Sequence, residues 1–226
     1  MPDEAIPLTP PRSRPSLREI LRARPWMAAP WIALFIAAPA VLLMRRRHPP
    51  VPVIRQLPSF ELTDQTAQRY GSEALRGHPW VANFMFTSCP FSCPRLTRHM
   101  ARVQEALRER GAATAPVRMV SFTVDPDVDT PSKLAEYARR YHVDAARWRF
   151  LTGPTPEIQR LSQEGFQIAM GAPPEGRPNG YNILHGEHIM LVDARGRIRG
   201  YYRASDEGLA SIVRDAETLS LETASH

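Results

Sequence analysis

Two cysteines, placed between an apolar run and a helical repeat, constrain this chain most strongly. Cys89 and Cys93 are the only cysteines in 226 residues. Residues 81–86, just before them, are almost all apolar and predict a buried strand. A repeat at helical spacing follows them, formed by Leu96, Met100, Val103 and Leu107. The two thiols are therefore expected in a strand-to-helix loop, with Cys93 at or near the helix N-terminus.

A position at the start of a helix predicts reactive cysteine thiols. Unpaired backbone N–H groups and the positive end of the helix dipole favour a thiolate, so we expect a lowered cysteine pKa. A thiolate is a nucleophile for disulfide exchange and a soft ligand for copper or zinc. The two sulfurs can meet as a disulfide or as two corners of a metal site, which needs a third ligand from elsewhere. An inert structural disulfide is the alternative, but so short a loop removes little chain entropy.

The charge of the chain is unevenly distributed. The formal net charge is +6, yet residues 1–48 contain eight arginines against three acidic residues. The rest of the chain is close to neutral, with 21 basic and 20 acidic residues. Since the basicity belongs to the N-terminal segment, the composition gives no support for a nucleic-acid-binding domain.

The first 58 residues divide into three predicted segments. Residues 1–25 are rich in Pro, Arg and Ser and predict a disordered cytoplasmic tail. Residues 26–44 contain no charge in nineteen positions, which is long enough for a single transmembrane helix. Residues 45–58 contain several prolines and predict an extended linker. A cleaved signal peptide is the alternative, but an apolar run of this length followed by Arg45-Arg46-Arg47 is unusual for one.

The orientation of this anchor depends on small differences. Five arginines precede the apolar run and three follow it, which weakly favours an N-terminus inside the cell. A cysteine pair that forms and breaks a disulfide suits an oxidising compartment. We therefore expect the folded domain on the outer side of a bacterial inner membrane, facing the periplasm.

Residues 59–226 predict one α/β domain. Strands are expected near residues 60–65, 80–86, 117–124, 148–151, 189–192 and 198–202. Helices are expected after the cysteines and near residues 72–75, 131–141, 153–163 and 206–219. Residues 166–181 are rich in Gly and Pro and predict a loop without a core pattern. This order of elements is typical of a thioredoxin-like sandwich.

Several motifs in this order resemble the Sco/SenC family of copper-binding, thioredoxin-fold proteins. They are Phe86-Thr-Ser-Cys89-Pro-Phe-Ser-Cys93-Pro94, Val124-Asp-Pro-Asp127 with Asp129-Thr-Pro131, Trp148-Arg-Phe-Leu-Thr-Gly153, and His185 eight positions before Asp193. The resemblance runs from about Phe60 to the last predicted helix.

The resemblance implies a function and a ligand set. In that family two cysteines and one distal histidine bind copper, which here implies Cys89, Cys93 and His185. It further implies a membrane-anchored copper metallochaperone that delivers copper to the CuA site of cytochrome c oxidase, or reduces the cysteines of that site. The implied partner is the copper-site subunit of the oxidase or another copper or thiol acceptor protein. Two thiolates and an imidazole form a soft site that suits copper.

Two histidines near the start of a predicted strand compete as the third ligand, and two short segments depart from the family pattern. His188 is the competitor of His185, but the family's spacing selects His185, and His188 is interpreted as a solvated residue. The family often has an acidic residue within the cysteine loop, where this chain has Phe91 and Ser92. It usually has Ser or Thr after the histidine, where this chain has Gly186-Glu187. These departures bear on copper affinity and on how the histidine is held.

Other readings of the same residues remain open. One is a thiol–disulfide oxidoreductase in which Cys89 and Cys93 are the redox-active pair and copper has little role. Peroxidase chemistry of the peroxiredoxin type shares the fold, but its usual Thr and Arg beside one cysteine are not identified. A copper or redox sensor is a further alternative. Asp125, Asp127 and Asp129 predict loop and helix-cap positions beside the site, with Asp125 the candidate to contact the ligands from outside.

Overall fold

The structure is a computed structural model that describes residues 50–90, 92–111, 117–168 and 188–224. The predicted tail, the predicted anchor at residues 26–44 and the start of the predicted linker lie outside these residues, as do Phe91 and His185. Among the helices of the described residues, none combines the length and the apolar composition of a membrane span.

The described strands form one eight-stranded mixed sheet, in the order β1-β8-β7-β4-β5-β6-β2-β3. Their bounds are β1 Arg55–Gln56, β2 Glu61–Asp64, β3 Arg69–Gly71, β4 Trp80–Met85, β5 Arg118–Thr123, β6 Trp148–Thr152, β7 His188–Val192 and β8 Arg197–Arg203. Strands β4, β5 and β6 are parallel, whereas β7 pairs antiparallel with both β4 and β8. The predicted strands are thus confirmed, and β1 and β3 add a short strand that was not predicted at each edge of the sheet.

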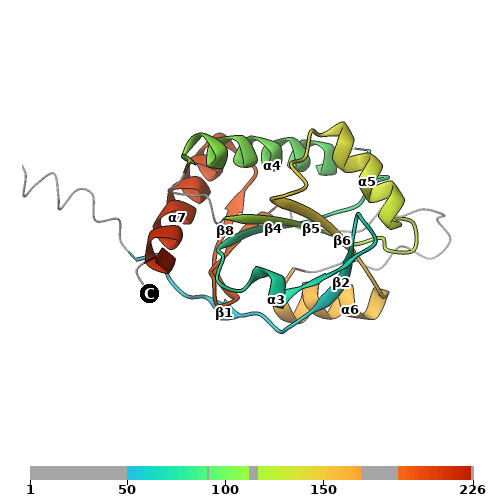
Figure 1. Ribbon diagram of the computed structural model, residues 1–226, viewed down its shortest axis with the longest axis horizontal. Coiled ribbons are helices and arrows are strands. Elements are labelled where there is room, and N and C mark those ends of the chain that lie inside the picture. The colour runs from blue at the N-terminus through green and yellow to red at the C-terminus, as the bar shows by residue number, and fades with distance from the viewer. Residues whose placement is uncertain (1–49, 91, 112–116, 169–187, 225–226) are drawn as a thin grey trace, which may run out of the picture. The chain divides into compact units, whose positions relative to one another are not determined.

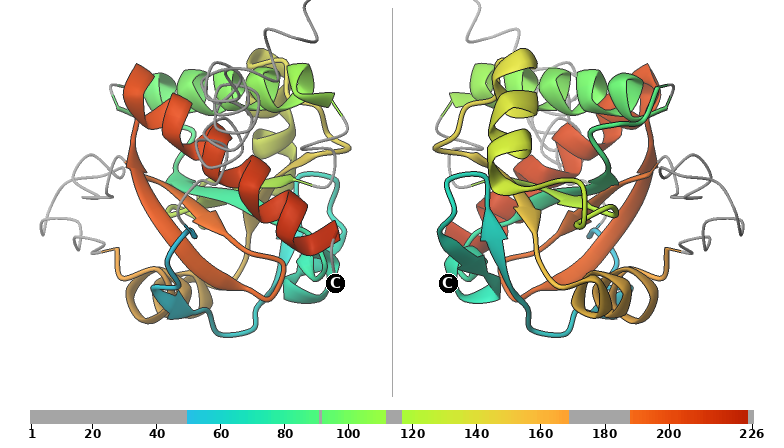
Figure 2. Two further views of the ribbon diagram at one scale, coloured as in Figure 1. Left: turned by 90° about the vertical axis from the view of Figure 1, so that its left-hand side faces the viewer. Right: turned by 90° about the vertical axis from the view of Figure 1, so that its right-hand side faces the viewer.

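Helices cover both faces of this sheet. Their bounds are α3 Ser72–Leu75, α4 Ser92–Glu109, α5 Pro131–Arg140, α6 Thr155–Arg160 followed by the π-helical turn η3 Leu161–Gly165, and α7 Asp206–Ala224. Helices α4, α5 and α7 lie on one face, and α3 and α6 lie on the other (Figures 1 and 2). Because α4 and α5 each connect neighbouring parallel strands, right-handed crossovers place both on the same face. The α/β sandwich predicted from the sequence is confirmed.

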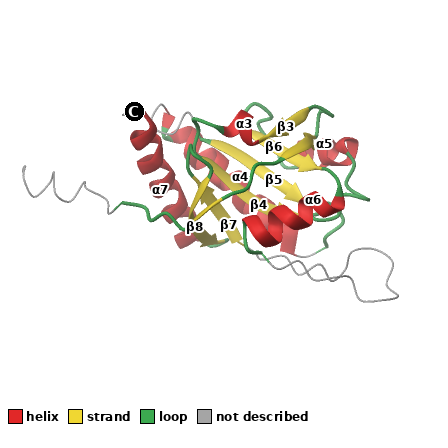
Figure 3. Ribbon diagram, turned by 90° about the horizontal axis from the view of Figure 1, so that it is seen from below, coloured by secondary structure: helices red, strands yellow, loops and turns green. Residues whose placement is uncertain are grey.

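The face that carries α3 and α6 is packed with aromatic rings. In Figure 3 α6 lies in front of the sheet and α4 lies behind it. Ring centroids in this cluster are 5.2 to 6.4 Å apart. Its members are Phe60, Trp80, Phe84, Phe122 and Phe166.

Two local predictions need correction. Phe166 and Ile168 were predicted to belong to a loop without a core pattern, but Phe166 is fully buried and Ile168 is 7% exposed. Phe166 follows η3, where the tightly packed Gly165 lets the chain approach Pro58 and Leu161. The last helix extends to Ala224, beyond the predicted end at residue 219.

The fold also includes residues that precede Ser59. Val51 and Leu57 are each 7% exposed, and β1 pairs with β8 through Arg55 and Ile198. The buried Arg199 guanidinium donates to the carbonyl oxygen of Val51 at 2.5 Å. The segment entering the domain is therefore fixed to the sheet edge by backbone and side-chain hydrogen bonds.

Candidate metal centre

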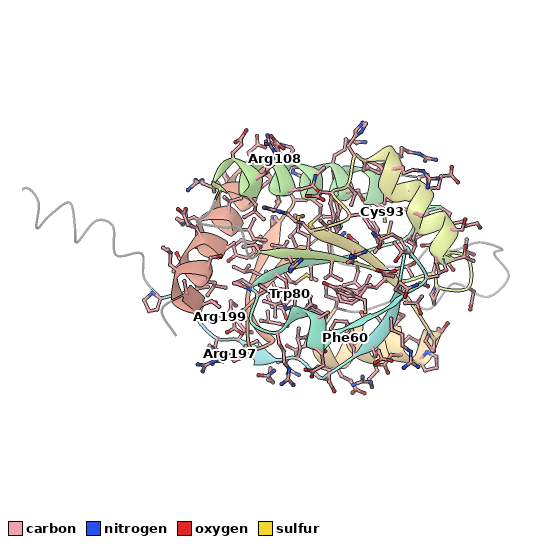
Figure 4. All side chains as sticks on the ribbon, in the orientation of Figure 1. Phe60, Trp80, Cys93, Arg108, Arg197 and Arg199 are labelled. Carbon is pink, nitrogen blue, oxygen red and sulfur yellow. The ribbon has the colours of Figure 1, made fainter. Side chains whose placement is uncertain are left out.

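The two cysteines lie at the junction between β4 and α4. Cys93 is the second residue of α4 and is fully buried, and Cys89 is 8% exposed in the preceding loop. The N–H of Cys93 donates to the sulfur of Cys89 at 3.3 Å. Cys89 therefore satisfies one of the N–H groups that a helix leaves open at its N-terminus, which holds the two cysteines together. Figure 4 shows Cys93 at the end of α4 near α5.

Both sulfurs are present as thiols in a largely buried setting. Burial raises the pKa of the Cys93 thiol well above its ordinary value, and the adjacent Cys89 acts in the same direction. Hydrogen bonds from the Phe86 backbone and from Ser92 oppose this shift but are the weaker influence. The predicted lowering of the pKa is therefore wrong for Cys93, because the loss of solvent outweighs the helix N-terminus.

A buried carboxylate holds the loop that leads to Cys89. Asp129 has no solvent exposure and accepts hydrogen bonds from the Thr87 N–H at 3.0 Å and from the Thr123 hydroxyl at 2.5 Å. The Thr87 hydroxyl donates to the second oxygen of the same carboxylate. One side chain thus joins the cysteine loop, the end of β5 and the start of α5. Buried polar groups tied in this way have one satisfied geometry, so the loop position is specified.

Two hydrogen-bonded hydroxyl groups also lie between α4 and α5, close to Cys93. The hydroxyls of Thr97 and Tyr137 are hydrogen-bonded at 2.9 Å, one helical turn beyond Cys93. Burial raises the pKa of Tyr137, and the negative charge that Cys93 would carry adds to the shift. Tyr137 therefore remains protonated at neutral pH and keeps a hydrogen bond that fixes α4 against α5.

Comparison with known proteins decides the family. The model of the family described as SCO1/SenC matches residues 54–219, which is most of the folded part of the chain. The chain belongs to the SCO1/SenC family.

Relatives of this SCO1/SenC chain agree with that assignment. The SCO1 protein homolog of Bacillus subtilis is 31% identical over 173 residues, covering 74% of this chain and 86% of the relative. The structure of BsSco, a member of the Sco family of cytochrome c oxidase assembly proteins in which a disulfide switch was identified, has a TM-score of 0.66. It is 29% identical and the match covers 76% of this chain and 98% of BsSco.

A third relative was solved with its metal. The copper-bound structure of ScoI from Bradyrhizobium japonicum has a TM-score of 0.59 at 25% identity, covering 70% of this chain and 98% of that protein. The predicted thioredoxin-like fold is therefore the fold of the family.

The structure brings together two of the three predicted ligands. Cys89 and Cys93 lie together where the loop after β4 enters α4, whereas His185 lies outside the described residues. Within the described residues, no group of three His, Cys, Asp or Glu side chains is placed to hold a metal ion. The two sulfurs alone fit a soft cation better than a hard one.

The competing histidine is placed by its strand. Met190 lies opposite Ala82, whose side of β4 also carries Trp80 and Phe84, so Met190 faces the aromatic cluster. His188 shares the side of Met190 because side chains alternate along a strand. It is exposed and lies on the face of the sheet opposite α4. This position agrees with the interpretation of His188 as a solvated residue.

The sequence predicted Asp129 beside the site but did not reveal that its side chain holds the cysteine loop. Asp125 was the acidic candidate, but it makes its hydrogen bonds to Thr123, Val128 and Asp129 through its backbone, and it is Asp129 whose side chain contacts Thr87. The partners Thr87 and Asp129 are 42 positions apart, so no local pattern reveals the contact. The signal available was an aspartate directly before the Thr130-Pro131 helix start.

Proposed function

We propose that this chain is a membrane-anchored copper metallochaperone of the outer face of a bacterial inner membrane. Its acceptor would be the CuA site of cytochrome c oxidase, to which it delivers copper or whose cysteines it reduces. The observation that carries the proposal is the pairing of Cys89 and Cys93 at the start of α4, in a family that includes a copper-bound member. Residues 26–44 would be the anchor and residues 1–25 a cytoplasmic tail, and of the predicted linker at residues 45–58 only the part before Val51 would be the connection, because Val51, β1 and Leu57 pack on the domain.

Copper would be held as cargo by Cys89, Cys93 and His185. The described start of β7 lies beside the end of β4, because β7 runs antiparallel to β4 and Ala82 pairs with Met190. His185 precedes His188 by three residues, which span at most about 10 Å. The chain therefore enters β7 at the sheet edge that carries the cysteine loop. This supports His185 as the third ligand.

The surroundings of the cysteines suit storage followed by release. Both thiols must lose their protons to bind copper, so uptake of the cargo releases protons. The Asp129 contacts keep the loop in place without contributing a charge to the metal, and burial keeps water from the sulfurs. Delivery would proceed by stepwise exchange, in which thiolates of the acceptor replace Cys89 and Cys93 one at a time.

A thiol–disulfide oxidoreductase is the second candidate, favoured by the adjacency of the two thiols and by the disulfide switch of BsSco. Cys89 is the better attacking group, because it is the more exposed and burial disfavours the Cys93 thiolate. Its sulfur would attack an acceptor disulfide and release one acceptor thiol. Cys93 would then attack Cys89, which forms the Cys89–Cys93 disulfide and releases the second thiol. Two electrons pass to the acceptor.

A titration of the reduced full-length protein in detergent with Cu(I), without oxygen, tests the ligand set. We expect one tightly bound copper per chain, with an affinity that falls at least about 100-fold in His185→Ala and stays within about 3-fold in His188→Ala. The matched pair controls for loss of a histidine as such. Loss of copper affinity in His188→Ala alone would identify His188, and not His185, as the third ligand. A wild-type protein that binds no copper would leave the oxidoreductase as the function.

A further inference from the structure

The first three turns of α4 carry a stripe of arginines on the side away from the core. Arg95, Arg98 and Arg102 are all exposed. Their spacing of three and four residues places them in one row along the helix. Residues 92–104 contain no acidic residue. Cys93 lies at this end of α4, and Arg108 marks the other end (Figure 4).

This charge pattern does not serve the helix itself. The positive end of a helix dipole favours acidic residues in the first turn, and α4 has none there. Arginines three and four residues apart also repel one another. The other end of α4 follows the usual rules, since Arg108 pairs with Glu105 and Arg110 pairs with Glu217, each at 2.5 Å. The stripe is therefore an arrangement that fold stability does not explain.

The positive charge of the stripe is only partly balanced by its neighbours. Arg102 forms an ion pair with Asp206 at the start of α7, at 2.7 Å. Arg98 forms no hydrogen bond or ion pair with the residues that the structure describes. Burial is the main cause that lowers the pKa of His99. The charges of Arg102, Arg95 and Arg98 lower this pKa further, whereas the charge of Asp206 raises it. A row of positive charge thus runs along the exposed side of α4, starting two residues beyond Cys93.

We propose that the arginine stripe docks an acidic surface of the protein that exchanges copper or thiols with Cys89 and Cys93. The proposal rests on the proposed function and adds the chemistry of the partner. Arg98 lies five residues beyond Cys93, or about 7.5 Å along the helix axis. An acidic surface seated on the stripe would therefore bring the partner's own sulfur ligands to the cysteine loop.

A protein partner fits this surface better than a nucleic acid. The stripe is one row of three charges, and the chain after residue 48 is nearly neutral, so it offers no broad basic face for a phosphate backbone. Complementary charge between proteins speeds encounter and fixes orientation, which a transfer between two small sites requires.

The test is the rate of Cu(I) transfer from the loaded full-length protein, in detergent, to the soluble copper-site domain of the oxidase subunit of the same organism. Wild type is compared with Arg98→Glu, with Arg98→Lys, and with Arg139→Glu, which makes the same change of charge at an exposed position of α5. Copper stoichiometry and the urea unfolding midpoint are measured for each protein, so that transfer is compared only between folded, loaded chains.

At low salt we expect Arg98→Glu to lower the second-order rate about 10-fold, while Arg98→Lys and Arg139→Glu stay within about 2-fold of wild type. The difference should disappear near 0.5 M salt, roughly where charge interactions are screened within a few ångströms. Equal rates for Arg98→Glu and wild type at low salt would overturn the docking proposal and leave the proposed function intact. A loaded wild type that transfers no copper at any salt would overturn both.

Discussion

The two faces of the central sheet are built on different physical principles. The face toward α3 and α6 is held by aromatic rings in contact, which stabilise it mainly through the large apolar area that they bury. The face toward α4 and α5 also has rings in contact, such as Trp148 and Phe150 at 5.2 Å, but it adds buried, hydrogen-bonded polar side chains. The Trp148 indole donates to the Ser121 hydroxyl at 2.9 Å, and that hydroxyl donates to the Asn83 side chain at 2.6 Å.

This difference indicates which face of the sheet fixes the geometry of the cysteine loop. Apolar packing tolerates small changes of geometry, whereas a buried hydrogen bond is satisfied only over a narrow range of distances and angles. The cysteine loop is fastened on the polar side, through Asp129, Thr87 and Thr123. We therefore expect the aromatic face to determine stability alone, and the polar face to determine both stability and copper affinity.

The largest expected effect is a loss of stability without a loss of function. Phe122 has four aromatic neighbours at 5.2 to 6.4 Å and no exposure, so Phe122→Ala opens a cavity. We expect the free energy of unfolding to fall by about 3–5 kcal/mol, measured in urea. The Cu(I) affinity of the folded fraction should stay within about 3-fold of wild type, because the cysteine loop is fastened on the other face. A tenfold loss of affinity would show that the two faces are not separate.

The next largest expected effect is a loss of both stability and Cu(I) affinity. Asp129→Ala leaves the Thr87 N–H and the Thr87 and Thr123 hydroxyls without their acceptor, so we expect unfolding to cost about 2–4 kcal/mol less. With the loop released, Cu(I) affinity should fall roughly 10- to 100-fold. Asp127→Ala is the matched control, since Asp127 is exposed, and both quantities should remain near wild type. An Asp129→Ala protein with normal affinity would mean that the loop holds its shape unaided.

Phe122 and Asp129 also show how much of the structure could be predicted from the sequence. Phe122 lies in an apolar strand whose burial the pattern predicts, and the helical repeat of α4 correctly placed Cys93 at its start. Phe166 and Ile168 were missed because they fall in a short segment without a helical or strand period before a Gly/Pro-rich stretch, and Phe166 directly follows η3. The Asp129 contacts were missed because they join segments far apart in the chain, and such pairings are set by the fold rather than by local periodicity.

A smaller effect separates the value of one polar contact from that of its partners. Tyr137→Phe and Thr97→Val each remove half of the 2.9 Å hydrogen bond behind Cys93. Each single change should lower the free energy of unfolding by about 1 kcal/mol, because the remaining hydroxyl stays buried and unsatisfied. The double variant should lose less than the sum of the two, since no polar group then remains. Additive losses in urea unfolding would indicate that the two hydroxyls act independently.

The smallest effect concerns charge beside the loop. Burial raises the pKa of Asp125, and the negative charges of Asp129 and Asp127 raise it further. A carboxyl with a raised folded-state pKa stabilises the fold when protonated, and this contribution is lost as the pH rises from about 4, the unfolded pKa, through the folded value. Ionised Asp125 thus destabilises the fold slightly at neutral pH.

Asp125→Asn should therefore be more stable than wild type at pH 7, by less than about 1 kcal/mol because the side chain is only half-buried. The two proteins should converge as the pH falls below about 4, where the wild-type carboxyl is protonated in both states. Urea unfolding at several pH values measures this, with Asp127→Asn as the exposed control. A stability difference that stays constant from pH 3 to pH 7 would assign the effect to the amide itself. Convergence at low pH would instead show that the ionised carboxylate of Asp125 bears an electrostatic cost on the polar side of the sheet, next to the cysteine loop.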